Sequence, residues 1–102
     1  MEPINDKLMR LSDRSFVWHC PGCESLHRVT VDPTKRPCWN YDGNPDAPTF
    51  SPSVLTRWKE HRDGDVVDMV CHCFVRNGNI EFLGDCTHTL AGKTVPLPDW
   101  PK

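Results

Sequence analysis

Two groups of side chains in this sequence have the types and spacing needed for chemistry. The first is a set of thiols: Cys20-Pro21-Gly22-Cys23 places two cysteines in one tight turn, and Cys71 and Cys86 follow much later in the chain. Two thiolates from a turn can bind one side of a tetrahedral Zn²⁺, and a distant second pair can complete the site. Four protein ligands leave no coordination position for water, so we expect a structural zinc held by Cys20, Cys23, Cys71 and Cys86.

Alternatives remain open for these thiols. Cys73, and after it His88, can replace Cys86 as the fourth ligand. Iron also occupies four-thiolate sites. Cys38, Cys73 and Cys86 can instead be small buried hydrophobic residues, which is common for free cysteine.

The second group is revealed by a hairpin in residues 70–85. Asn77-Gly78 is typical of a two-residue β-turn, which fixes the register of the strands on either side, from Arg76 opposite Asn79 to Val70 opposite Asp85. Since directly paired residues share a face, this register predicts a face of thiols and apolar side chains and an opposite face that carries His72 and Asp85. The thiol face contains Cys71, Cys73, Val75, Ile80, Phe82 and Cys86.

On the second face, Asp85 lies diagonally across the hairpin from His72. A carboxylate can orient an imidazole and stabilise its charged form, as a general base requires. The candidate nucleophile is Ser53, in Ser51-Pro52-Ser53, because a serine hydroxyl becomes reactive when a histidine accepts its proton. Asp85 can alternatively cap a short helix, and the serines can simply bond to turn backbone.

His88 has three open roles. It follows Cys86 by two residues, so it can be a metal ligand, a second acid–base group or a surface residue. The segment that carries it begins with a capping residue and ends at Gly92, which predicts one short helical turn near residues 86–92.

The fold class predicted is mainly β. Ten prolines and six glycines in 102 residues interrupt any long helix. Short strands are expected at residues 15–19, 26–31, 38–41 and 54–58, the first two forming a zinc-knuckle hairpin in a small antiparallel sheet. We expect an N-terminal extension at residues 1–12, a single zinc-stapled β domain at 13–102, and an irregular proline-rich C-terminal tail that docks on its own domain through Trp100.

Composition limits the class of partner. Lys and Arg total 12 against 14 Asp and Glu, a net charge of −2, which disfavours a nucleic-acid partner. No apolar run is long enough to cross a membrane. The first residues lack the apolar stretch of a signal peptide, so we expect a cytoplasmic protein with reduced cysteines rather than a secreted disulfide framework. Oligomeric state is not predicted.

Longer motifs carry a family resemblance. Cys20-Pro21-Gly22-Cys23, the segment Pro48–Ser53 and the segment Phe82–Pro98 together resemble a family of small phage and prophage proteins of unknown function. Its members are often labelled ammonia monooxygenase, although nothing in this sequence resembles a multi-helix membrane copper enzyme. Phage origin would place the protein in the cytoplasm of a bacterial host.

The same family is distantly similar to the peptidase component of bacterial ubiquitin-like conjugation operons. That similarity implies a serine protease that trims or removes a ubiquitin-like tail. It assigns Ser53 as nucleophile and His72 as base, with Asp85 or His88 as the third member. The leading hypothesis is therefore a serine hydrolase acting on a peptide or ubiquitin-like tail; the alternative is a non-enzymatic, zinc-stabilised module that binds a protein partner.

Overall fold

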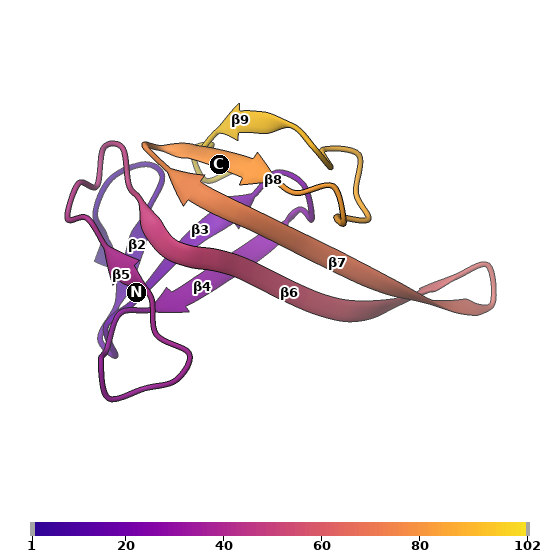
Figure 1. Cartoon of the computed structure of the whole chain (residues 1–102), viewed down its shortest axis with the longest axis horizontal. Helices are drawn as coiled ribbons and strands as arrows, with labels where there is room; N and C mark the ends of the chain where they lie inside the picture. Colours follow the sequence, from indigo (N-terminus) through magenta and orange to yellow (C-terminus); the bar gives the residue numbers. More distant parts are fainter. Residues whose placement is uncertain (1, 102) are drawn as a thin grey trace.

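The computed structural model describes residues 2–101, which form two antiparallel sheets and no helix. The first sheet has the strand order β1-β2-β3-β4 and the second has the order β5-β6-β7-β8-β9 (Figure 1). The strands are β1 (Glu2–Pro3), β2 (Met9–Leu11), β3 (Ser15–Cys20), β4 (Ser25–Thr30), β5 (Asn40–Tyr41), β6 (Phe50–Arg62), β7 (Asp65–Arg76), β8 (Asn79–Phe82) and β9 (Thr94–Pro96). The mainly β prediction is confirmed. No helix in this range is long and apolar enough to cross a membrane.

The core lies between the inner faces of the two sheets. Trp18 of β3 has no exposed surface and stacks on Phe50 of β6, with 5.5 Å between ring centroids. The inner face of β7 adds Cys71, Cys73 and Val75, all fully buried. Burial of a large aromatic side chain supplies much of the apolar area that a domain of this size can remove from water, so this contact fixes how the sheets meet.

The hairpin between β7 and β8 has the predicted register. Asn77 and Gly78 both have positive φ, 50° and 79°, as a type I′ turn requires. Pairing runs from Arg76 opposite Asn79 to Cys73 opposite Phe82. All six members of the predicted thiol face are buried, so that prediction is confirmed.

The predicted pairing is wrong beyond Leu83. The Leu83 N–H still donates to the His72 carbonyl at 2.9 Å, but the chain then turns, and the amide of Thr87 rather than that of Asp85 lies opposite Val70, at 3.0 Å from its carbonyl. Residues 86–92 continue as hydrogen-bonded turns, in which the Ala91 N–H donates to the His88 carbonyl. No helix forms in this segment, so the short helical turn predicted for residues 86–92 is wrong.

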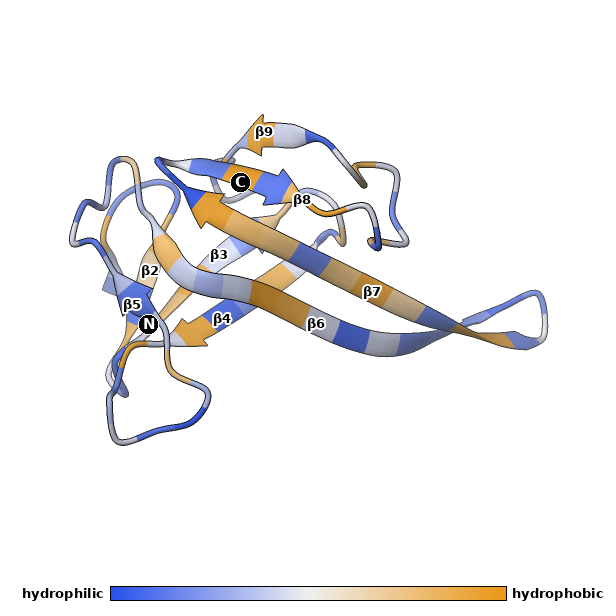
Figure 2. Cartoon of the chain, viewed as in Figure 1, coloured by the Kyte–Doolittle hydropathy of each residue, from blue (hydrophilic) through white to orange (hydrophobic). Residues whose placement is uncertain are grey.

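The longest element is the hairpin of β6 and β7, whose end projects beyond the other strands (Figure 1). It closes at Asp63 and Gly64, again both at positive φ, 51° and 83°. Hydrophilic residues predominate on β6 towards the projecting end, whereas hydrophobic ones are frequent where β7 crosses the first sheet (Figure 2). The body of the hairpin is therefore held by the core, and its end extends into solvent.

Both chain ends join the sheets. Residues 2–11 contribute β1, β2 and the fully buried Leu8. The C-terminal tail supplies β9, which pairs with β8. Trp100 donates its indole N–H to the Lys7 carbonyl at 3.0 Å and its backbone N–H to the Asp6 carbonyl at 2.9 Å. Docking of the tail on its own domain is thus confirmed.

Candidate active site and metal centre

Ser53 lies at an irregularity in β6. The pairing of β6 with β7 shifts between Phe50 and Val54, so the three residues between them form a bulge. Bulges change the direction of side chains and are frequent beside functional sites. The indole N–H of Trp39 donates to the Ser53 carbonyl at 3.3 Å, which ties the bulge to the loop before β5.

His72 lies on the outer face of β7, within reach of both expected partners. Its Nε2 is 3.1 Å from the Ser53 Oγ, and its Nδ1 is 3.0 Å from the Asp85 Oδ2. A carboxylate can only accept, so the Nδ1–H donates to Asp85, which leaves Nε2 to accept the Ser53 hydroxyl. This is the order of contacts needed for a histidine to remove a serine proton.

The site is open to solvent. The His72 side chain is 25% exposed and that of Asp85 is 55% exposed, and Ser53 is partly exposed. No backbone amide among residues 2–101 donates to the Asp85 carboxylate, so helix capping does not compete for it there. A substrate can therefore approach Ser53 and His72, the candidate catalytic dyad, directly. Water weakens the interaction between Asp85 and the His72 ring.

His88 lies with the sulfur atoms rather than with Ser53. Its Nε2 is 3.4 Å from the Cys71 Sγ, and its ring packs edge-on against Phe82, with 4.7 Å between centroids. The ring also covers the knuckle, since a Cβ on Gly22 would lie only 2.3 Å from it. Of the two candidates for a third member, Asp85 is therefore the one beside His72.

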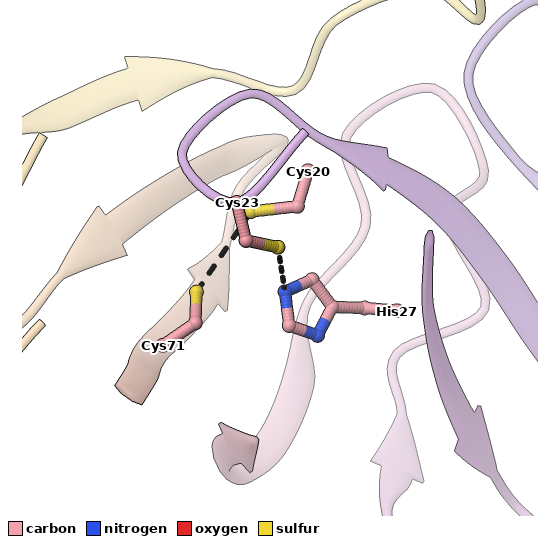
Figure 3. Close-up of side chains that lie close together, drawn as sticks. All are labelled: Cys20, Cys23, His27 and Cys71. Carbon is pink, nitrogen blue, oxygen red and sulfur yellow. Dashed lines mark hydrogen bonds between the residues drawn. The ribbon is translucent and has the colours of Figure 1, made fainter. Parts of the chain in front are cut away.

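Cys20, Cys23, His27 and Cys71 form a compact group that can hold a metal ion (Figure 3), with all four ligand atoms within 4.8 Å of one another. Three thiolates and one imidazole are a donor set typical of structural zinc. The Cys20 and Cys71 sulfurs are 3.8 Å apart, which fits the spacing of about 3.8 Å that two Zn–S bonds of about 2.3 Å give at a tetrahedral angle. The residues therefore fit a zinc ion.

The contacts of the His27 ring suit a residue that coordinates a metal ion. Its Nε2 faces the Cys23 Sγ at 3.3 Å, and its Nδ1 contacts the Thr56 Oγ1 at 3.2 Å; such a partner fixes the orientation of a ligating ring. Burial lowers the pKa of His27, but its hydrogen bonds and charge interactions with Cys20 and Cys23 outweigh burial and raise that pKa to about 10.

The crowded sulfurs also perturb one another. Hydrogen bonds from Cys20 and Cys71 lower the pKa of the Cys23 thiol well below its usual value, whereas contacts with Cys20 and Cys23 raise that of Cys71. Close thiolates cannot all hold negative charge without a compensating cation. This electrostatic conflict is the one that a divalent metal removes.

Cys86 belongs to a second group, with Cys71 and His88. Its sulfur lies 3.2 Å from both the backbone nitrogen and the carbonyl oxygen of His72. A metal-binding role for Cys86 stays a prediction, and His27 is the fourth member of the group that contains Cys20 and Cys23. The pairing of Cys20 with Ser25 and of Trp18 with His27 puts His27 on the Cys20 face, a signal that the knuckle hairpin already contained.

β7 contributes a residue both to the group of Cys20, Cys23, His27 and Cys71, called here the metal group, and to the dyad. Cys71 and His72 are consecutive in β7, so alternation directs the thiol inward and the imidazole outward. The Cys86 thiol contacts the main chain of His72 from the side opposite β6. The strand segment that carries His72 is therefore contacted on one side by Cys86 and adjoins the metal ligand candidate Cys71 in the chain.

One comparison with known proteins gives a match. A model of the family described as bacterial ubiquitination-like system serine protease (BubE) matches residues 2–83. The matched range includes Ser53, His72 and the whole metal group, and it ends two residues before Asp85. No curated protein and no solved structure matches the chain.

Proposed function

This chain belongs to the family of bacterial ubiquitination-like system serine proteases, and we propose that it is a serine peptidase with Ser53 as nucleophile and His72 as general base. The observation that carries this proposal is the contact of 3.1 Å between the His72 Nε2 and the Ser53 Oγ. A module that only binds a partner has no need for that contact, nor for a carboxylate behind the ring. Asp85 completes the site as the group that orients His72.

The reaction is acyl transfer. Ser53 Oγ attacks the carbonyl carbon of the scissile bond while His72 Nε2 takes its proton, and backbone N–H groups at the bulge are the candidate donors to the oxyanion. His72 then returns the proton to the leaving amine, and the acyl group remains on Ser53. A water molecule, deprotonated by His72, releases the acid and regenerates the serine.

The metal centre has a structural role in this proposal. Zn²⁺ held by Cys20, Cys23, His27 and Cys71 would neutralise the thiolates and fasten the knuckle to β7. These four residues would fill a tetrahedral coordination shell, which would leave the ion no position for substrate. The chain's own contribution is positional, because Cys71 fixes the strand segment on which His72 stands.

The substrate class follows from the family. A protease of a ubiquitination-like system is expected to cut at the C-terminal tail of a ubiquitin-like protein, either to mature it or to release it from a conjugate. The six free cysteines suit a reducing compartment, the bacterial cytoplasm. Phage or prophage origin belongs to the same proposal.

Hydrolysis of a small activated ester tests the dyad without knowledge of the substrate. Zinc-loaded protein should hydrolyse p-nitrophenyl acetate, and Ser53→Ala should abolish the protein-dependent rate. Ser51→Ala is the matched control, since Ser51 lies two residues away in the same bulge and has no contact with His72. Equal rates for wild type and Ser53→Ala would refute the proposal.

A further inference from the structure

Beyond Ser53, one edge of β6 has no neighbouring strand among residues 2–101. β5 pairs only with Phe50 and Ser51, and beyond Ser53 only β7 pairs with β6. The uncovered edge therefore begins at the bulge that carries the proposed nucleophile. Unpaired strand edges present rows of N–H and C=O groups that can bind another extended chain.

The turn of the hairpin identifies the groups on this edge. In a two-residue turn the closing pair, Arg62 and Asp65, is hydrogen-bonded, and bonded pairs then alternate along the ladder. Leu55, Arg57 and Lys59 fall in the other pairs, so their N–H and C=O groups point away from β7.

The partners of these residues agree with that assignment. His72 and Val70, which lie opposite Leu55 and Arg57, use their own carbonyls on the far side of β7, as acceptors for Leu83 and Thr87. Within residues 2–101, the main chains of Leu55, Arg57 and Lys59 have no hydrogen-bond partner on the outer edge. Three N–H and three C=O groups are thus available for hydrogen bonding along the segment Leu55–Lys59.

The side chains of Leu55, Arg57 and Lys59 lie on the same face of the sheet as the His72 side chain. Leu55 lies directly opposite His72 and is 46% exposed. An added strand would run about 4.8 Å from β6, and on reaching the bulge it would pass Ser53. The Trp39 indole already bonds the Ser53 carbonyl, so β pairing would stop where the scissile bond must lie.

We propose that the substrate is an extended peptide segment that adds to the free edge of β6 along Leu55–Lys59 and so brings its scissile bond to Ser53. This inference rests on the proposed function and names how the same site recognises its substrate. Main-chain bonds supply affinity in this mode, and side chains on alternate positions supply selectivity. A flexible tail can form such a strand, whereas a folded loop cannot.

The charges along this edge indicate which kind of peptide binds there. Lys59 is paired with Asp68 at 2.9 Å, whereas Arg57 has no ion pair among the described residues. Arg57 therefore favours a peptide with an acidic side chain opposite it, and Leu55 favours an apolar one. Two copies of β6 would bring these cations together, and like charges on neighbouring strands are destabilising, which disfavours a second copy of this chain.

A proline at position 57 tests the edge. Proline removes the outward N–H of Arg57 and is tolerated on an edge strand, whereas Arg57→Ala removes only the side chain. The readout is the ratio of kcat/KM for an internally quenched decapeptide library to kcat/KM for p-nitrophenyl acetate. We expect Arg57→Pro to lower this ratio about tenfold or more relative to Arg57→Ala. Proline removes one hydrogen bond to the peptide and also obstructs pairing of the peptide with β6, and both effects weaken peptide binding.

A second measurement uses the wild-type protein. Single N-methylation along a cleaved peptide should reduce cleavage at alternate residues, since only every second N–H of an added strand faces β6. Equal ratios for the proline and alanine variants, or uniform tolerance of N-methylation, would overturn the inference. Ester hydrolysis that depends on Ser53, without cleavage of any peptide, also overturns it. Absence of that ester hydrolysis instead refutes the proposed function.

Discussion

Replacement of Asp85 tests whether its carboxylate orients His72 during catalysis. The Asp85 Oδ2 lies 3.0 Å from the His72 Nδ1, yet the Asp85 side chain is 55% exposed. In a buried triad, changing the aspartate to asparagine costs about 10⁴ in kcat because the histidine takes the wrong tautomer. Here water can replace part of the lost contact, so the effect must be smaller.

The expected magnitude follows from the contact. A hydrogen bond to a charged group contributes about 1.5–3 kcal/mol, and exposure places Asp85 at the lower end of that range. Since about 1.4 kcal/mol corresponds to a tenfold change in rate, we expect Asp85→Ala to lower kcat/KM about tenfold. Asp85→Asn should lower it more, about 100-fold, because the amide can donate to Nδ1 and thereby put the proton on Nε2.

The assay is Ser53-dependent hydrolysis of p-nitrophenyl acetate by zinc-loaded protein. Asp68→Asn is the matched control, since Asp68 is an exposed carboxylate on the same face of β7 and pairs with Lys59 instead. If Asp85→Asn retains the wild-type rate while Ser53→Ala is inactive, the orienting role is refuted. If Asp85→Ala is slower than Asp85→Asn, the tautomer argument is wrong.

Three further predictions concern the scaffold. Purified protein should contain one zinc per chain, and Cys23→Ser should lose it whereas Cys38→Ser, outside the metal group, should keep it; equal zinc content by elemental analysis would contradict the assigned ligands. Trp18→Ala should reduce the free energy of unfolding by about 3–5 kcal/mol, measured by urea denaturation; a loss below about 1 kcal/mol would mean that the sheets do not meet at Trp18. Gly22→Ala should displace His88, whose ring lies 2.3 Å from the new Cβ, and so shift the His88 ring resonances in NMR spectra; unchanged resonances would contradict the close packing.

Local patterns predict much of the fold. Asn77-Gly78 alone fixes the register of β7 and β8, and from it the separation of the buried thiols from His72. The proximity of Ser53 to His72 does not follow from such rules. The two-residue turn at Asp63 and Gly64 sets the register of β6 against β7, but the contact also depends on the bulge between Phe50 and Val54, which no residue pattern in the sequence marks.

The fourth member of the metal group shows a related limit. The register of the knuckle hairpin puts His27 on the Cys20 face, but the choice between His27 and Cys86 depends on how the two sheets pack. That packing is set by Trp18 against Phe50, a contact between different sheets. The first dozen residues likewise carry little strand pattern, and they gain their place by pairing with β3.

The central claim is that Ser53 is an activated nucleophile. Its most direct test is intact-mass and peptide mass spectrometry of zinc-loaded protein after treatment with a fluorophosphonate. We predict a single adduct on Ser53, formed in wild type and in Ser51→Ala and greatly slowed in His72→Ala. An unmodified Ser53, or modification that is independent of His72, would contradict the claim.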